Sequence, residues 1–239
     1  MQTNTGINFP VLEVFYFLSI RELIVEKGKL IVLEGLDGCG KTTQQGLLYN
    51  ALNREGLETI AINNVSDSIF GKTIRAALAD RKYCVNSKQM AALYIAELHY
   101  VTETIKEAIY SGKNVICSRH YLSTLAYAGT DDSVVNGIIE LSKYDIMPDV
   151  IYYIGVPFKT IHERLTKNSN PDFYETSHKQ KEVLERYEYF THPDNEPFGT
   201  PIVKIDGSLS VYAIVTLILQ DLYPRLSYKY SKDEKDPQC

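Results

Sequence analysis

Short runs of apolar residues recur along the chain, separated by longer and more polar segments. Runs of this length are typical of strands that are buried on both faces, as in a parallel sheet. They lie at Leu30–Leu33, Thr59–Ile62, Val115–Cys117, Val150–Ile154 and Ile202–Ile205. Because helical segments alternate with them, we predict an α/β fold with a five-stranded parallel sheet flanked by helices. In such a sheet, ligands bind beyond the carboxyl ends of the strands.

Three longer segments between and after these runs have the helical period. A glycine follows each of the first two, at the position of a C-terminal helix stop, and a proline follows the third. The segments are Thr42–Arg54, Ser87–Tyr110 and Ser210–Leu222. We expect these elements to form a single domain over residues 28–225.

The two ends of the chain depart from this pattern. Residues 1–27 form an N-terminal extension, whose apolar stretch from Phe9 to Ile20 contains Glu13. That stretch is shorter than the roughly 20 apolar residues that a membrane span needs, and it lacks the basic start and cleavage site of a signal peptide. We expect the extension to pack on the domain or on a partner. Residues 226–239 are rich in charge and are expected to form a flexible tail.

The charge and the cysteine pattern exclude some classes of binding partner and of metal site. The net charge is −5, so no general electrostatic attraction to nucleic acid is expected. The four cysteines lack CxxC spacing, which argues against a zinc site and against a secreted disulfide framework. We therefore predict a cytoplasmic protein that binds neither nucleic acid nor membrane.

The segment EGLDGCGKTT, at residues 34–43, has the spacing of a phosphate-binding loop, G-x-x-x-x-G-K-[ST]. Its glycines let successive backbone amides face phosphate oxygens, and the start of the following helix adds its dipole. Lys41 is expected to contact the β- and γ-phosphates of ATP, and the Thr42 hydroxyl to ligate Mg²⁺. The sequence thus predicts a P-loop NTPase fold. The expected ATP-binding residues are Gly35, Leu36, Asp37, Gly38, Cys39, Gly40, Lys41, Thr42 and Thr43.

Two further charged residues are candidates for catalysis beside Lys41. Arg119 follows the third apolar run, where its five donors suit a bridge between two phosphates. Asp37 lies inside the phosphate loop, where a carboxylate would repel phosphates unless a cation or a sugar hydroxyl compensates for it. We predict that Lys41, Arg119 and Asp37 form the catalytic centre.

Residues 164–181 are polar and lack an apolar stripe. We interpret them as a small mobile lid over the phosphates, since a closing lid would exclude water from a phosphoryl transfer. An ordinary solvated loop explains the same composition equally well. The candidate cations of the lid are Arg164 and Lys167.

Several motifs resemble those of the thymidylate kinase family of nucleoside monophosphate kinases, from about Lys29 to Tyr223. They are similar, in order, to the phosphate loop of that family, its D-R-Y-x-x-S-x-x-A-Y segment, its P-D-[LV] strand, its lid motif D-R-[FY]-E and its adenine loop. The matching segments are LEGLDGCGKTTQ at 33–44, RHYLSTLAY at 119–127, MPDVIYYIGVP at 147–157, DFYE at 172–175 and VKIDGS at 203–208.

This resemblance implies a role for each matching residue. Lys41 and Thr42 would hold the ATP phosphates and Mg²⁺, and Arg119 would bridge the donor and acceptor phosphates. On the acceptor, Asp37 would accept a hydrogen bond from the 3′-hydroxyl of the sugar, and Tyr94 would stack on the base. Tyr127 would pack against the deoxyribose. In the lid, Glu175 would organise the closed state. Members of the family are commonly homodimers, so the resemblance implies a homodimer, formed through the helix at Ser87–Tyr110.

The sequence also departs from the family pattern, mainly on the acceptor side. A serine replaces the aspartate near Mg²⁺, a leucine replaces the arginine that reads thymine, and an alanine replaces a residue that often touches the base. An expected arginine for the acceptor phosphate is missing from residues 63–68, and a phenylalanine replaces the lid arginine. The four substituted positions are Ser118, Leu98, Ala128 and Phe173.

The predicted function is ATP-dependent phosphorylation of a deoxynucleoside monophosphate, with dTMP to dTDP as the favoured reaction. Two alternatives stay open. A deoxynucleoside kinase would need the missing acceptor-phosphate arginine less, and a degenerate nucleotide-binding protein would explain Ser118 and Phe173. A GTPase switch is disfavoured, because the sequence has no N-K-x-D motif.

Overall fold

The computed structural model describes residues 26–79, 85–128, 131–165 and 177–226. Its centre is a sheet of five parallel strands in the order β2-β3-β1-β4-β5. The strands are β1 (Leu30–Glu34), β2 (Thr59–Asn63), β3 (Asn114–Ser118), β4 (Val150–Gly155) and β5 (Ile202–Asp206). The predicted five-stranded parallel sheet is therefore confirmed, and each strand extends the predicted apolar run by one or two residues.

Eight helices are described around this sheet. They are α2 (Lys41–Arg54), α3 (Ile69–Ala79), α4 (Ser87–Tyr110), α5 (Tyr121–Tyr127), α6 (Asp132–Ser142), α7 (Phe158–Leu165), α8 (Ser177–Phe190) and α9 (Val211–Arg225). The bounds of α4 are those expected from the sequence, and a capping box fixes its start, because the Asn86 and Gln89 side chains each bond the other's backbone amide.

Helix α9 continues past Leu222, where the sequence predicted its end. Pro224 lies in its last turn and removes one backbone donor from the helix. The amide of Leu226 still donates to the carbonyl of Leu222, at 3.1 Å, so the final turn closes despite the proline. The helix therefore includes the proline and ends at Arg225.

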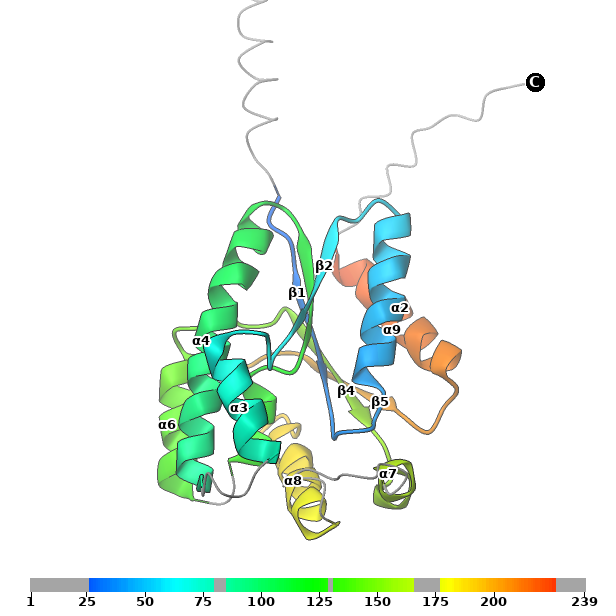
Figure 1. Cartoon of the computed structure of the whole chain (residues 1–239). Helices are drawn as coiled ribbons and strands as arrows, with labels where there is room; N and C mark the ends of the chain where they lie inside the picture. The colour runs from blue at the N-terminus through cyan, green and yellow to red at the C-terminus, as the bar shows by residue number, and fades with distance from the viewer. Residues whose placement is uncertain (1–25, 80–84, 129–130, 166–176, 227–239) are drawn as a thin grey trace, which may run out of the picture.

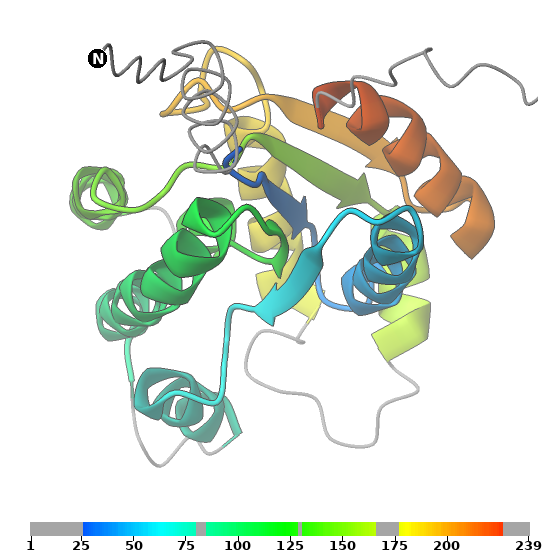
Figure 2. The same ribbon diagram turned by 90° about the horizontal axis from the view of Figure 1, so that it is seen from above.

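The helices cover both faces of the sheet (Figures 1 and 2). Side chains of β1 alternate between the faces: Ile31 and Leu33 pack with α2 and α9, whereas Leu30 and Val32 face the core formed with α4, α5 and α8. All four are completely buried, as expected for the central strand of a parallel sheet. The central strand is thus closed off from solvent along both of its faces.

Polar contacts tie helix α2 to two strands of the sheet. The Gln45 side chain, which is buried, donates to the carbonyl of Ile62 in β2 at 2.8 Å and to that of Ile116 in β3 at 3.0 Å. Buried amide groups need such partners, because an unpaired one costs free energy. The contacts hold the first turns of α2 against β2 and β3.

The expected terminal segments fall largely outside the described residues, since the description begins at residue 26 and ends at residue 226. Of the predicted lid, residues 164–165 belong to α7 and residues 177–181 to α8, while the segment between them is outside the description. Among the described helices, none is both long enough and apolar enough to cross a bilayer.

We predict that Leu48→Ala lowers the free energy of unfolding by about 2–5 kcal/mol, because it opens a cavity between α2 and the sheet. Leu48 is completely buried. The control is Asn50→Ala, an exposed position on the same helix, which should change stability by less than about 1 kcal/mol. Equal losses in denaturant titrations of the two variants would contradict the assignment of this face to the core.

Candidate active site

The loop between β1 and α2 is shaped by three glycines with positive φ: Gly35 (139°), Gly38 (78°) and Gly40 (106°). At Gly35 there is also no room for a side chain, since a Cβ would lie 2.7 Å from the carbonyl oxygen of Ile154 and 2.9 Å from the Cys39 sulfur. Gly40 caps α2 without any side-chain hydrogen bond, so the first amides of this helix are left for an anion. This is the backbone arrangement that a phosphate-binding loop requires.

Lys41 lies at the start of α2 and its side chain is buried. Its ammonium donates to the carbonyls of Gly35, at 2.8 Å, and Leu36, at 2.9 Å. Burial, together with repulsion from Arg119, lowers the pKa of Lys41. The positive charge therefore lies against the phosphate loop, within reach of any anion that the loop holds.

A cleft of about 440 Å³ opens in front of this loop. The side of the cleft formed by α2 and the loop contains six of the nine predicted ATP-binding residues. The other three, Gly35, Leu36 and Cys39, are buried behind it. The residues lining the cleft are Asp37, Gly38, Gly40, Lys41, Thr42, Thr43, Asn63, Asn64, Val65, Ser118 and Arg119.

Arg119 directly follows β3 and has φ of 73°, a conformation that only a few per cent of residues other than glycine adopt. Its amide donates to the carbonyl of Leu33 at 3.0 Å, which carries the β1–β3 pairing one residue beyond the strand. The guanidinium donates to Asp37 at 2.5 Å and to the Ser123 hydroxyl at 3.0 Å. The strained backbone thus directs this side chain across the site toward the phosphate loop.

Cationic side chains compensate the negative charge of Asp37, as expected from the sequence. Its two carboxylate oxygens accept from Arg119 and, at 2.8 Å, from the Tyr127 hydroxyl. Burial alone would raise the pKa of Asp37, but the charges of Arg119 and Lys41 and the Tyr127 hydrogen bond hold it well below its usual range. Asp37 is therefore a carboxylate at any physiological pH.

A buried carboxylate that sequence reasoning missed supports these residues. Glu34, at the end of β1, is completely buried and accepts from the amide of His120 at 2.7 Å and the Ser123 hydroxyl at 2.5 Å. Tyr187 of α8 donates to the same carboxylate at 3.0 Å. Glu34 opens the phosphate-loop motif, which was a usable signal. Nothing in the sequence near Tyr187 pointed to the site.

A second, smaller cavity of about 130 Å³ adjoins the cleft. It brings together all four residues predicted to bind the acceptor, which are Asp37, Tyr94, Arg119 and Tyr127. Sequence reasoning did not assign the rest of its lining to the acceptor: Asn64, Val65, Leu78, Ser123 and Thr124. Asp37, Asn64, Val65 and Arg119 line both cavities, so the two lie next to one another at these residues.

The positions at which this sequence substitutes a residue of the family pattern do not line this cavity, or they lie outside the described residues. Leu98 is completely buried in the core and does not line the cavity, and Ala128 lines a different hollow, between α4, α5, α6 and α8. Of the predicted lid residues, Arg164 belongs to α7, but its side chain is not described. Lys167 and Glu175 lie outside the described residues.

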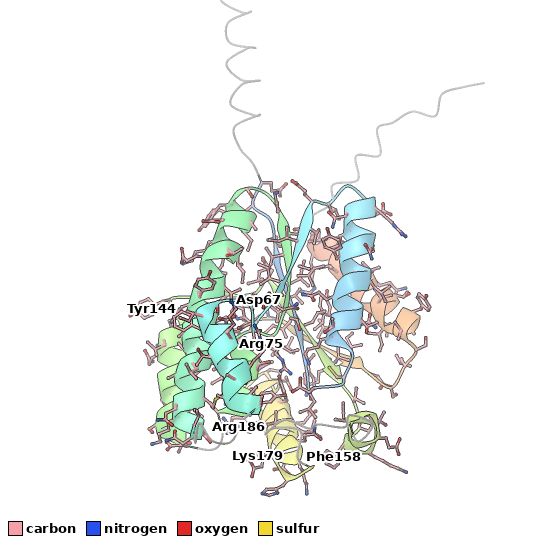
Figure 3. The ribbon with its side chains drawn as sticks, in the orientation of Figure 1. Asp67, Arg75, Tyr144, Phe158, Lys179 and Arg186 are labelled. Atoms are coloured by element: carbon pink, nitrogen blue, oxygen red, sulfur yellow. The ribbon has the colours of Figure 1, made fainter. Side chains whose placement is uncertain are left out.

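An arginine does contact the segment at residues 63–68, though from the outer side. Arg75 of α3 donates to the carbonyl of Ser66 at 2.8 Å and to Asp67 at 2.9 Å, and the pair lies beside α3 and α4 in Figure 3. Arg75 does not line the acceptor cavity. It braces the loop after β2 and does not replace the arginine that the family pattern would supply.

The sequence profile of the thymidylate kinase family matches residues 33–218. The chain belongs to the thymidylate kinase family. Thymidylate kinase of Desulfotalea psychrophila is 33% identical over 141 residues, which are 59% of this chain and 70% of that protein. Thymidylate kinase of Fervidobacterium nodosum is 31% identical over 190 residues, 77% of this chain and 93% of that protein.

A solved thymidylate kinase structure, from Candida albicans, resembles this family member with a TM-score of 0.70. The match covers 83% of this chain and 92% of the other at 21% identity. The predicted family and the predicted P-loop α/β fold are therefore confirmed. Family membership also supports the prediction of a nucleoside monophosphate kinase.

The burial of His120 can be tested through the pH dependence of stability. The side chain is completely buried, and neither ring nitrogen has a hydrogen-bond partner among the described residues. Burial lowers the pKa of His120 to about 3. In an unfolded chain the pKa is about 6.5. Above that pH the histidine is neutral in both states and stability is unaffected. As the pH falls from 6.5 toward 3, only the unfolded chain takes up the proton, and stability is lost.

We predict that, between pH 7 and pH 4.5, this member of the family loses roughly 2–3 kcal/mol more stability than its His120→Phe variant. The measurement is denaturant unfolding at both pH values. His192→Phe, at an exposed histidine, serves as the control and should follow the unmodified protein. Parallel losses in all three proteins would contradict a buried neutral His120.

Proposed function

We propose that the protein transfers the γ-phosphoryl group of ATP to dTMP and so forms dTDP and ADP. The observation that carries this proposal is the junction of the two cavities, one against the phosphate loop and one lined by aromatic and polar side chains. An acceptor in the smaller cavity would direct its reacting end at the phosphates in the larger one. Family membership supports the same reaction.

Catalysis would consist mainly of positioning and charge stabilisation. Lys41 and the amides at the start of α2 would hold the β- and γ-phosphates, and Arg119 would contact the phosphoryl group during transfer. An oxygen of the acceptor phosphate attacks the γ-phosphorus while the bond to ADP breaks, so no protein nucleophile is needed. The Asp37 carboxylate fixes the guanidinium before the substrates bind.

The acceptor would be held by the residues of the smaller cavity. We assign Asp37 to the 3′-hydroxyl of the sugar, Tyr94 to the face of the base and Tyr127 to the wall of the deoxyribose. Burial raises the pKa of Tyr127 well above its usual value, so its hydroxyl stays protonated and able to donate. Stacking and hydrogen bonds of this kind would bind the nucleotide although no cationic side chain contacts its base.

The residues at the phosphate loop suit Mg²⁺, which usually binds few protein ligands beside substrate phosphates and waters. Thr42 is exposed, and both Thr42 and Ser118 line the cleft where a triphosphate would lie. Magnesium would neutralise charge on the transferred phosphoryl group. Thr42 would hold it, with Ser118 in place of the aspartate of the family pattern.

The lid and the location of the protein remain predictions. Arg164, Lys167 and Glu175 would close over the phosphates and exclude water. The cytoplasm is the location that the cysteine pattern favours.

A deoxynucleoside kinase is not favoured, because the matched family acts as monophosphate kinases. A panel of dTMP, dUMP, dGMP and thymidine, with labelled ATP and product separation, decides between the acceptors. Phosphorylation of thymidine but not of dTMP would overturn the proposal. ATP binding without turnover on any acceptor would favour a degenerate protein.

We predict that Lys41→Ala lowers turnover by at least about 10³-fold, because it removes the buried charge beside the phosphates. Circular dichroism should be unchanged. The control, Lys72→Ala on the exposed side of α3, should keep full activity. Turnover retained in Lys41→Ala would count against the proposed mechanism.

We also propose a homodimer formed through α4. Tyr100 of this helix and Tyr144, which projects from the protein after α6 in Figure 3, are exposed large side chains on the α4 side of the molecule. Tyr100→Glu should shift the sedimentation coefficient to that of a monomer, because a buried unpaired charge is costly. Tyr212→Glu, on α9, is the control and should leave the dimer intact. A monomeric unmodified protein would refute this proposal.

A further inference from the structure

The junction between the two cavities is formed by four residues: Asp37, Asn64, Val65 and Arg119. Asp37 and Arg119 are paired with one another, and Val65 is apolar. Asn64 is the remaining polar residue, and its carboxamide lies where an acceptor would meet the donor phosphates. Neither the motifs nor the family pattern assigned it a role.

The backbone of Asn64 is held in place by the sheet. It follows directly after β2, and its amide donates to the carbonyl of Ser118 at 3.0 Å, which extends the β2–β3 pairing by one residue. The Gln45 side chain bonds the carbonyl of Ile62, two residues earlier. The side chain of Asn64 therefore starts from a fixed point at the carboxyl edge of the sheet.

The carboxamide itself lacks a partner in the described part of the chain. Asn64 is 6% exposed, and its Oδ1 atom is buried without a hydrogen bond. A buried amide that fills space in a core is normally hydrogen-bonded, because desolvation without compensation is unfavourable. An unpaired amide at the meeting point of two cavities is instead poised to bond a ligand.

The charge at the junction limits what that ligand contact can be. The Arg119 guanidinium and the Asp37 carboxylate offset one another, so a neutral amide is the remaining polar group there. A carboxamide offers both an NH₂ donor and a carbonyl acceptor. The carbonyl oxygen is the buried atom here, which leaves the NH₂ group as the end that a ligand can reach. A phosphate at this point needs donors, which the NH₂ group supplies.

We propose that Asn64 is a specificity-determining residue, whose Nδ2 group donates to a phosphate oxygen of the acceptor nucleotide and orients that phosphate toward the donor. This rests on the proposed function and names the residue that reads the acceptor phosphate. The contact is neutral, so it adds a directed hydrogen bond without changing the net charge at the junction.

The test compares Asn64→Asp and Asn64→Ala with the unmodified protein. Asn64→Asp is nearly the same shape, but it removes the donors and adds a charge that repels phosphate. We expect KM for dTMP to rise about 10- to 100-fold in Asn64→Asp and less in Asn64→Ala. KM for ATP should change less than about threefold. Asn50→Asp, exposed on α2, adds the same charge elsewhere and should leave both constants unchanged.

A second measurement separates contact with the phosphate from a structural role. Calorimetric binding of dTMP and of thymidine to each variant should show that Asn64→Asp weakens dTMP binding much more than thymidine binding. Equal weakening of both, or an unchanged dTMP affinity in a folded variant, would overturn the assignment. A lower melting temperature with unchanged KM for dTMP would identify Asn64 as structural only, and would also overturn it.

The proposed function is tested separately, by measurements on the unmodified protein. If that protein binds dTMP without phosphorylating it, the proposed reaction fails, while the binding comparison still supports or overturns the role of Asn64. If it binds thymidine but not dTMP, both proposals are rejected.

Discussion

The ion pair between Arg119 and Asp37 is the interaction on which the rest of the site depends. It joins the end of β3 to the loop that follows β1, and it compensates a carboxylate that would otherwise repel phosphates. The guanidinium reaches Asp37 from a strained backbone position, with φ of 73°. The pair also lines both cavities, so in the proposed reaction it lies where the donor and the acceptor would meet.

Hydrogen bonds to the buried Glu34 carboxylate support this pair. The buried carboxylate accepts from the start of α5 and from Tyr187 of α8, and the Ser123 hydroxyl lies between it and Arg119. Three elements far apart in the sequence are thus held at one point. Such support fixes the charged groups before a substrate arrives, which is the condition for electrostatic stabilisation of a transition state.

The acceptor side of the site relies on neutral groups. Leu98, at the position of a base-reading arginine, is buried in the core, and Arg75 bonds the outside of the loop after β2. The smaller cavity is lined by tyrosine rings, hydroxyl groups and Asn64, together with the Arg119–Asp37 pair, so we propose that recognition there relies mainly on neutral groups. Hydrogen bonds to buried neutral groups can discriminate strongly, because a wrong ligand leaves them unpaired.

The sequence by itself determined the sheet, the phosphate loop and the candidates Lys41 and Arg119, because buried strands and glycine turns are local patterns of residue type. It also identified α4 to the residue, since caps and periodicity act within a few positions. It misplaced the end of α9, because the final turn closes around Pro224. The phosphate-loop motif was a signal for Glu34, but the burial and the partners of Glu34, Tyr187 and Asn64 were decided by tertiary structure, because they depend on which distant segments the fold brings together.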